Sequence, residues 1–216
     1  MRQKKIILFD LDGTLTDSAP GIIHSVQYAL QYYHLSDTDA ESLNRFIGPP
    51  IRDSFIDFYG FSKEKADEAV EKYREYFSVK GKYENSVYEG IPFVLKALKK
   101  LGKQLLVATA KPQVFAEDIL SHFGLIQYFD FISGATLDAS RATKEKVIAY
   151  ALKHVPVTNL QDAVMIGDRS QDVAGAKENG LEVIGVRYGY AKPGELEEAG
   201  ADEIAETVSD LLQILK

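Results

Sequence analysis

The chain contains 216 residues, a length that allows one sizeable hydrophobic core with or without a small second unit. Its formal net charge of −7 argues against a nucleic-acid or membrane-surface binder, because such proteins usually present a basic face. Cysteine is absent, which excludes disulfides, a zinc–thiolate site and a thiol nucleophile. No uncharged segment approaches the roughly 20 residues needed to span a bilayer. We therefore expect a cytoplasmic protein.

A short apolar run near the start of the chain ends in acidic residues. Residues 6–9 read IILF without polar alternation, which predicts a strand buried on both faces of a parallel sheet. The next five residues, 10–14, read DLDGT. Because side chains alternate along a strand, Asp10 and Asp12 would face the same way at its carboxyl end. Two adjacent carboxylates are costly without a cation, and Mg²⁺, which binds carboxylates together with phosphate oxygens, is the cation we expect.

The same segment has a plainer interpretation as a turn, since aspartate and glycine are common turn formers. However, DLDGT resembles the first motif, D-x-D-G-T, of the haloacid dehalogenase-like (HAD) hydrolases, and the resemblance extends over nearly the whole chain. It is closest to the phosphoglycolate-phosphatase-like subgroup with a helical cap. In that family the first aspartate attacks phosphorus, while the second protonates the leaving oxygen and then activates water. The resemblance assigns these two roles to Asp10 and Asp12.

The order of the predicted elements indicates two domains. Residues 17–85 read as helices without a convincing strand, whereas strands and helices alternate from residue 86 onward. The alternation predicts an α/β fold, a doubly wound parallel sheet with its site at the strand carboxyl ends. We expect residues 1–16 and 86–216 to form this Rossmann-like core and residues 17–85 to form a small all-α cap inserted after strand 1. The predicted strands after the first are 104–108, 131–133, 163–166, 181–186 and an edge strand at 201–205.

A candidate phosphate-binding residue lies where the second core strand meets a helix. Thr109 ends the strand, and free amides in the first turn of the helix that follows would help to hold an anion. The segment resembles the second HAD motif, which assigns Thr109 and Ala110 to substrate binding. Ala110 departs from the Asn or Ser of many phosphoglycolate phosphatases, which weakens a specific substrate assignment. An ordinary helix cap is the alternative role for Thr109.

Lysine 144 is the candidate for neutralising charge at the site. It opens the helix predicted at 143–154 and resembles the third HAD motif, whose lysine offsets the charge of the aspartate and the phosphate. A compact ammonium group suits that role, which would make Lys144 both catalytic and substrate-binding. Lys146 is the rival candidate.

A second acidic segment follows the strand predicted at 163–166. Residues 167–172 read GDRSQD and resemble the fourth HAD motif, G-D-x-x-x-D, which completes the metal site. The resemblance implies that the metal ligands are Asp10, Asp12 and Asp168. Asp172 would support them by orienting water or Ser170, with a plain helix cap as its alternative.

Three features of the predicted cap remain open to interpretation. Arg52 follows a Gly-Pro-Pro corner that resembles the cap segment facing the active site in related phosphatases, so it would bind a substrate carboxylate or a second phosphate; a solvated arginine is the alternative. Gly81 suits a hinge or a helix terminator. We expect the cap tyrosines to form its core: Tyr28, Tyr32, Tyr33, Tyr59, Tyr73 and Tyr76.

These features predict a Mg²⁺-dependent phosphomonoester hydrolase that acts on a small phosphorylated metabolite through an aspartyl-phosphate. Residues 111–125 and 134–138 also resemble 5′-nucleotidases, so nucleoside monophosphates are an alternative substrate. A phosphosugar mutase, which returns the phosphoryl group to a sugar, is a second alternative. A non-catalytic binding protein on the same fold is a third, because a fold alone does not prove activity. The sequence predicts no oligomeric state.

Overall fold

The chain forms two compact units in this computed structural model, which describes residues 4–35, 40–156 and 159–216. Unit 1 contains Met1–Thr16 and Val87–Lys216, and unit 2 contains Asp17–Ser86. The chain passes between the units in two short strands, β2 (Thr16–Asp17) and β3 (Ser86–Val87), which pair with each other. Neither strand was predicted, because two residues are too few to show a period.

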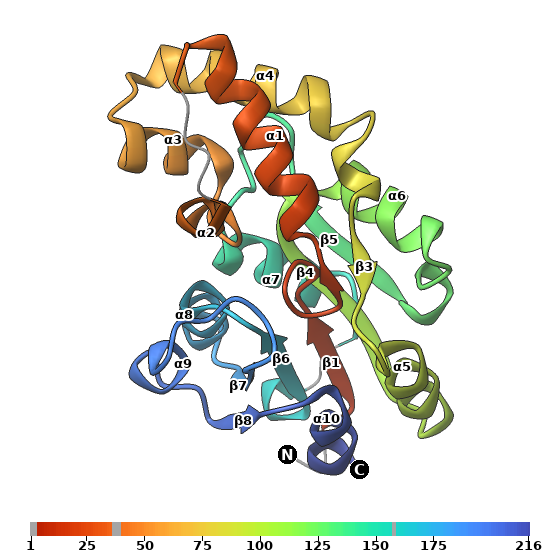
Figure 1. The fold of residues 1–216 in the computed structure, drawn as a ribbon. Helices are drawn as coiled ribbons and strands as arrows, with labels where there is room; N and C mark the ends of the chain where they lie inside the picture. The colour runs from red at the N-terminus through yellow and green to blue at the C-terminus, as the bar shows by residue number, and fades with distance from the viewer. Residues whose placement is uncertain (1–3, 36–39, 157–158) are drawn as a thin grey trace. The chain divides into compact units, whose positions relative to one another are not determined.

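Unit 1 is built on a six-stranded sheet in which the paired strands run parallel (Figure 1). The strand order is β5-β4-β1-β6-β7-β8, so the last strand lies at an edge, as predicted. The α/β fold class is therefore confirmed. The strands are β1 (Ile6–Phe9), β4 (Gln104–Pro112), β5 (Phe131–Ala135), β6 (Ala163–Gly167), β7 (Glu182–Val186) and β8 (Glu203–Ala205).

Strand β1 lies between β4 and β6, and the direction of winding reverses there. From β1 the chain proceeds through β4 to β5, and it then returns to β6 on the other side of β1 before continuing to β7 and β8. All four residues of β1 are buried, which explains why the strand lacks polar alternation. Ligands of such sheets bind outside the carboxyl ends of the strands where the order reverses. In this chain, residue 10 and residue 168 follow the two strands that meet at that point.

Helices cover both faces of the sheet. On one face, α7 (Lys144–Lys153) and α8 (Ser170–Glu178) pack through Val147, Ile148 and Val173 against β1 and β6 residues such as Leu8 and Met165. Two further helices contact the sheet, α5 (Ile91–Lys100) at β4 and α6 (Gln113–His122) at β4 and β5. The right-handed rule for crossovers between parallel strands assigns them to the opposite face. There α10 (Val208–Leu215) packs against α5, while the short α9 (Glu195–Glu198) follows β7 (Figure 1). Full burial of a side chain such as Leu8 contributes about 1.5–3 kcal/mol.

Unit 2 is helical between its two connecting strands. Its longest helices, α1 (Ala19–Tyr32) and α4 (Lys63–Phe77), pack together, and Ser62 caps α4 by accepting the Lys65 N–H at 3.2 Å. The shorter elements are α2 (Ala40–Leu43), α3 (Ile51–Tyr59) and two 3-10 turns, Asn44–Phe46 and Gly81–Tyr83. In the part of the chain that the structure describes, no helix combines the length and the apolar content needed to cross a membrane.

Two expectations about unit 2 need correction. Tyr73 is buried, but Tyr28 and Tyr32 are exposed, and their hydroxyl groups donate to glutamates on α4, so phenylalanines such as Phe46 and Phe55 form the core instead. Gly81 does not end a helix, because α4 ends at Phe77. A Cβ atom at Gly81 would lie 2.6 Å from the Ser25 hydroxyl oxygen, so close packing against α1 explains this glycine better than a hinge does.

Candidate metal and phosphate site

The carboxyl end of β1 carries Asp10 into a tight turn. The Asp10 N–H donates to the Ile166 carbonyl at 2.9 Å, which continues the pairing with β6 for one more residue. The chain then turns at Gly13, which has a φ of +80° and donates its N–H to the Thr16 carbonyl at 2.8 Å. A Cβ atom at this position would lie 2.1 Å from Oδ2 of Asp168. Glycine is therefore needed both for the backbone angle and for the space that the Asp168 carboxylate occupies.

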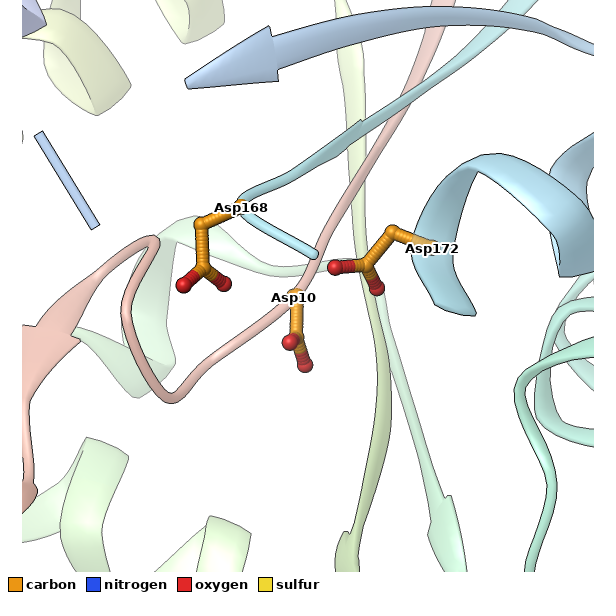
Figure 2. Close-up of side chains that lie close together, drawn as sticks. All are labelled: Asp10, Asp168 and Asp172. Atoms are coloured by element: carbon orange, nitrogen blue, oxygen red, sulfur yellow. The ribbon is translucent and has the colours of Figure 1, made fainter. Parts of the chain in front are cut away.

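Three buried carboxylates converge beside this turn (Figure 2). Asp10 follows β1, Asp168 follows β6, and Asp172 lies in the first turn of α8. Each offers one oxygen atom, and these three atoms lie within 4.8 Å of one another. Carboxylate oxygens at this spacing are suitable ligands for a hard divalent cation.

The Asp168 side chain is fully buried and held from two sides. Its Oδ2 accepts the Tyr190 N–H at 2.8 Å, and its Oδ1 accepts the Thr14 hydroxyl at 3.3 Å. A Cβ atom at Gly189 would lie 2.3 Å from the Asp168 Cβ, so the backbone of residues 189–190 packs directly on this side chain. Burial raises the pKa of Asp168 well above its ordinary value, and the neighbouring Asp172 and Asp10 raise it further.

Lys144 lies between two of the carboxylates. Its Nζ is 2.6 Å from Oδ1 of Asp10 and 2.7 Å from Oδ1 of Asp172, and its side chain is 4% exposed. Burial disfavours the charged form of Lys144, but Asp10 and Asp172 outweigh this effect and raise its pKa above the ordinary value. The rival, Lys146, is on the exposed surface, where its Nζ donates to the Ser140 carbonyl at 3.4 Å. The structure therefore brings Lys144, and not Lys146, to the aspartates.

Two opposing effects act on Asp10. Burial favours its protonated form, whereas the ammonium group of Lys144 favours the carboxylate. Together with the repulsion from Asp172 and Asp12, the result is a pKa of about 6 for Asp10, against an ordinary value of 3.8. A divalent cation at the site would lower this pKa and keep Asp10 ionised at neutral pH.

A second buried ion pair joins β4 to the turn. The Nζ of Lys111 lies 3.0 Å from Oδ2 of Asp12, and the Lys111 side chain is 4% exposed. Two residues earlier in the same strand, Thr109 is also buried, and its hydroxyl oxygen accepts the Lys111 N–H at 3.2 Å. Ala110, between them, is partly exposed. Asp12 is thus held by a lysine and lies outside the group of three carboxylates.

Arg52 belongs to unit 2, in the first turn of α3. Its guanidinium group binds both carboxylate oxygens of Asp67 on α4, through Nε to Oδ1 and through a terminal nitrogen to Oδ2. The pair is exposed, and it raises the pKa of Arg52 and lowers that of Asp67. Binding of substrate by Arg52 stays a prediction.

Four residues around the aspartates were not identified from the sequence. Thr14, Lys111, Gly189 and Tyr190 contact Asp12 or Asp168 through a hydroxyl, an ammonium group, close packing and a backbone N–H. Lys111 has one available signal, because it lies two residues after Thr109 and so shares its side of the strand. Tyr190 reaches Asp168 through its backbone N–H. Nearly every residue type has this group, so the sequence carries no signal for the contact.

Several known proteins are similar in sequence to this chain over nearly its whole length. A 5′-nucleotidase of Pseudomonas aeruginosa is 44% identical over 97% of this chain and 95% of its own length. The tyrosine-protein kinase PtkA of Mycobacterium tuberculosis is 36% identical over 98% of this chain and 72% of its own. A phosphoglycolate phosphatase of Colwellia psychrerythraea is 27% identical over 100% of this chain and 99% of its own.

A solved structure and a family profile give the same assignment. The crystal structure of a predicted phosphatase from Clostridium acetobutylicum superposes with a TM-score of 0.95 and 48% identity, over 98% of this chain and 97% of that one. The profile of the haloacid dehalogenase-like hydrolases matches residues 7–186, which include the first acidic turn, Thr109, Lys144 and the second acidic segment. The order of these segments along the chain and the convergence of the aspartates and Lys144 in space have the same explanation: this protein belongs to the haloacid dehalogenase-like hydrolase family, as its sequence predicted.

Proposed function

We propose that the protein is a Mg²⁺-dependent phosphomonoesterase that acts on small phosphorylated metabolites through an aspartyl-phosphate. The observation that carries this proposal is the charge balance of the buried site. Four aspartates and two lysines lie there, so two negative charges remain uncompensated when all six groups are ionised. Burying excess charge is costly, and a site that does so is suited to a charged ligand.

The donor atoms fit a hard divalent cation. Carboxylate oxygens suit Mg²⁺, Ca²⁺ or Mn²⁺, and cysteine is absent from the sequence, so no thiolate is available for a softer metal. Mg²⁺ is favoured because it is commonly held by one or two carboxylates together with substrate phosphate. We assign its protein ligands to Asp10, Asp12 and Asp168, with Asp172 in support. Asp172 pairs with Lys144 and accepts the Arg169 N–H, so its carboxylate links the buried lysine to the start of α8.

In the first proposed step, an oxygen of Asp10 attacks the phosphorus atom of the ester. The bond to the ester oxygen breaks, and Asp12 donates its proton to the departing alkoxide. Lys144, held beside Asp10 by a 2.6 Å contact, offsets the charge that develops on the transferred phosphoryl group. The hydroxyl group of Thr109 donates to a non-bridging oxygen of the phosphoryl group. A cation held by Asp10, Asp12 and Asp168 would neutralise phosphate charge and so favour attack by Asp10.

In the second step, Asp12 removes a proton from a water molecule that attacks the same phosphorus atom. The bond between phosphorus and the Asp10 oxygen breaks, which releases inorganic phosphate and restores the Asp10 carboxylate. Asp12 regains the proton that it lost in the first step. Lys111 fixes the Asp12 side chain from the β4 side, so that one carboxylate can serve both steps.

Unit 2 is our candidate for the cap of the enzyme, with domain boundaries close to residues 17 and 86. It is inserted directly after the turn that carries Asp12, and it consists of helices, which supports this assignment. Such an insertion would contribute residues that select the substrate and exclude water from the phosphoenzyme. Arg52 is the residue that we assign to substrate selection.

Of the possible substrates, nucleoside monophosphates deserve the first place in a screen. The 5′-nucleotidase relative is 44% identical to the chain, whereas the phosphoglycolate phosphatase is 27% identical. The decisive experiment measures inorganic phosphate released from nucleoside monophosphates, phosphoglycolate and sugar phosphates, with Mg²⁺ and with EDTA. We expect release with Mg²⁺ and none with EDTA. Absence of release from the whole panel would reject the proposal and favour a binding protein.

Two further readouts separate hydrolysis from transfer. A mutase would need a sugar bisphosphate activator and would yield an isomer in place of inorganic phosphate. Because PtkA is also a relative, ATP and a tyrosine-containing protein belong in the panel. If phosphotyrosine forms from ATP and no phosphate is released from simple esters, the proposed hydrolase activity would be rejected in favour of a kinase activity.

A further inference from the structure

One carboxylate outside the aspartate cluster joins three segments of unit 1. Glu195, the first residue of α9, accepts the Arg169 Nε–H and the Ser170 backbone N–H through Oε1, both at 2.9 Å. Its Oε2 accepts the Lys192 N–H at 3.1 Å. The Arg169 and Glu195 side chains are 11% and 13% exposed, so this ion pair is mostly shielded from solvent. Glu195 therefore fastens residues 169–170 and residue 192 to the start of α9.

The segments that Glu195 joins are those that flank the Asp168 carboxylate. Residues 169 and 170 follow Asp168 directly, and Ser170 begins α8, which carries Asp172. Lys192 lies two residues after Tyr190, whose N–H donates to Oδ2 of Asp168 at 2.8 Å. The Asp172 carboxylate also accepts the Arg169 N–H at 3.1 Å. Both backbone stretches that orient Asp168 thus lead to the same glutamate.

We propose that the Arg169–Glu195 pair positions Asp168 and Asp172 for binding of the divalent cation. This inference rests on the proposed function, which places a cation at these aspartates. Glu195 reaches the cluster through the backbone of residues 168–170 and 189–192, and the same carboxylate holds the Arg169 side chain, so it acts as a positioning residue. Partners that orient metal-binding side chains typically change metal affinity or activity by 10–100-fold when they are lost.

Loss of the Glu195 charge would weaken the contacts that hold the segments on either side of Asp168. The Glu195→Gln variant keeps an amide oxygen for the Ser170 N–H but removes the negative charge beside the shielded Arg169 guanidinium group. The loop of residues 187–192 would then lose its charged anchor at Lys192, and Tyr190 would hold Asp168 less firmly. We therefore expect weaker binding of the cation, with a smaller effect on turnover once the site is saturated.

The chain offers a matched control in the same helix. Glu197 also pairs with an arginine, Arg187, but these side chains are 47% and 36% exposed. The Glu197→Gln variant removes one negative charge from α9, as Glu195→Gln does, without touching residues 168–170. It therefore accounts for any general effect of net charge on cation binding.

The test is a titration with Mn²⁺ in which binding is measured by calorimetry or by the EPR signal of the free ion. It compares the unaltered protein, Glu195→Gln, Glu195→Asp and Glu197→Gln, and the steady-state parameters kcat and KM for phosphate release are measured at saturating metal. We expect Glu195→Gln to raise the Mn²⁺ Kd about 10–100-fold. Glu195→Asp, which keeps the charge but has a shorter reach, should raise it less, and Glu197→Gln should leave it unchanged.

The outcomes separate this inference from the proposed function. If the unaltered protein binds no Mn²⁺, the proposed cation site is rejected. The proposed Mg²⁺-dependent function and the positioning role of Glu195 are then rejected with it. If it binds Mn²⁺ and Glu195→Gln binds equally well, or if Glu197→Gln weakens binding to the same extent, the positioning role is rejected while the proposed function stands. Should Glu195→Gln fail to fold, Glu195→Asp carries the test, and an unchanged Kd in that variant would likewise reject the role.

Discussion

The buried ion pairs of the aspartate site in unit 1 and the exposed ion pairs of unit 2 use the same residue types in opposite ways. In unit 2, pairs such as Arg74–Glu71 and Lys72–Glu75 lie one turn apart on the exposed surface of α4. In unit 1, Lys144 is buried between Asp10 and Asp172, and Lys111 is buried against Asp12. The exposed pairs match one cation with one anion, whereas the buried site holds more anions than cations.

This difference shows why the number of ion pairs says little about function. Solvent already compensates the exposed charges of unit 2, so each of these pairs is worth little and can be lost without consequence. At the aspartate site of unit 1 the protein must compensate the charges itself, and each missing partner leaves a buried charge. The comparison predicts that similar substitutions have large effects at one location and small effects at the other.

The largest effect is expected for the proposed nucleophile. Asp10→Asn should reduce phosphate release by roughly 10⁴-fold or more, because an amide cannot form the aspartyl-phosphate. The variant should stay folded by circular dichroism, since Lys144 keeps Asp172 as a partner. Glu71→Gln on the exposed face of α4 is the control and should retain full activity. Wild-type hydrolysis by Asp10→Asn would show that the nucleophile is another residue.

Removal of the buried lysine should affect both activity and stability. Lys144→Met leaves Asp10 and Asp172 without their cation, so we expect kcat to fall about 10²–10³-fold and the free energy of unfolding, measured in EDTA, to fall by about 3–5 kcal/mol. The loss of stability should be greater at pH 8 than at pH 5, because Asp10, with a pKa of about 6, is protonated at the lower pH. Equal losses at both pH values would contradict the assigned charge pair.

The third prediction links the cation to pH. The pKa of Asp10 is raised from 3.8 to about 6, so this group stabilises the metal-free fold below pH 4, and its contribution is lost as the pH rises to 6. Mg²⁺ binds the ionised form, so it should restore stability above pH 6 and have little effect at pH 5. At 100 times Kd the gain is about 2.7 kcal/mol, or a Tm increase of about 5–10 °C for a chain of this size.

Thermal melts with Mg²⁺ and with EDTA at pH 5 and pH 7.5 test this prediction. Asp168→Asn serves as the control, because a variant that lacks one ligand should show a much smaller shift at either pH. A Mg²⁺-induced shift that is as large at pH 5 as at pH 7.5 would mean that the cation binds elsewhere.

The smallest effect is expected for Arg52. Because its pair with Asp67 is exposed, Arg52→Ala should leave the Tm unchanged, and it should leave the chemistry intact. If Arg52 binds part of the substrate, the ratio of kcat/KM values between nucleoside monophosphates and phosphoglycolate should change. An unaltered ratio would leave Arg52 as a surface residue of unit 2.

The sequence predicted the strands and the acidic turns well, because their signals are local. Residues 6–9 are buried on both faces and therefore carry a continuous apolar run, and the strand predicted at 163–166 differs from β6 by one residue. Strand β4 extends beyond the predicted end to Pro112, since its register with β5 shifts between Ala108 and Pro112. An irregularity of that kind depends on the neighbouring strand and leaves no periodic signal.

Residues that reach the aspartates from distant segments were harder to predict. Lys111 and Tyr190 contribute through positions fixed by the sheet, at 99 and 22 residues from Asp12 and Asp168. The tyrosines of unit 2 illustrate the opposite error: an aromatic side chain predicts burial, but a polar hydroxyl next to glutamates on α4 allowed Tyr28 and Tyr32 to remain at the surface.

The pairing of β1 with β6 has a consequence for how the enzyme matures during synthesis. Asp10 emerges from the ribosome early, but Asp168 and Asp172 emerge only after more than 150 further residues, including all of unit 2. If the proposed cation site forms, a nascent chain that stops before β6 would lack Asp168 and Asp172 and would gain no stability from Mg²⁺. Retention of the metal would therefore report that β1 and β6 have paired, and a truncated product would be left exposed to proteolysis.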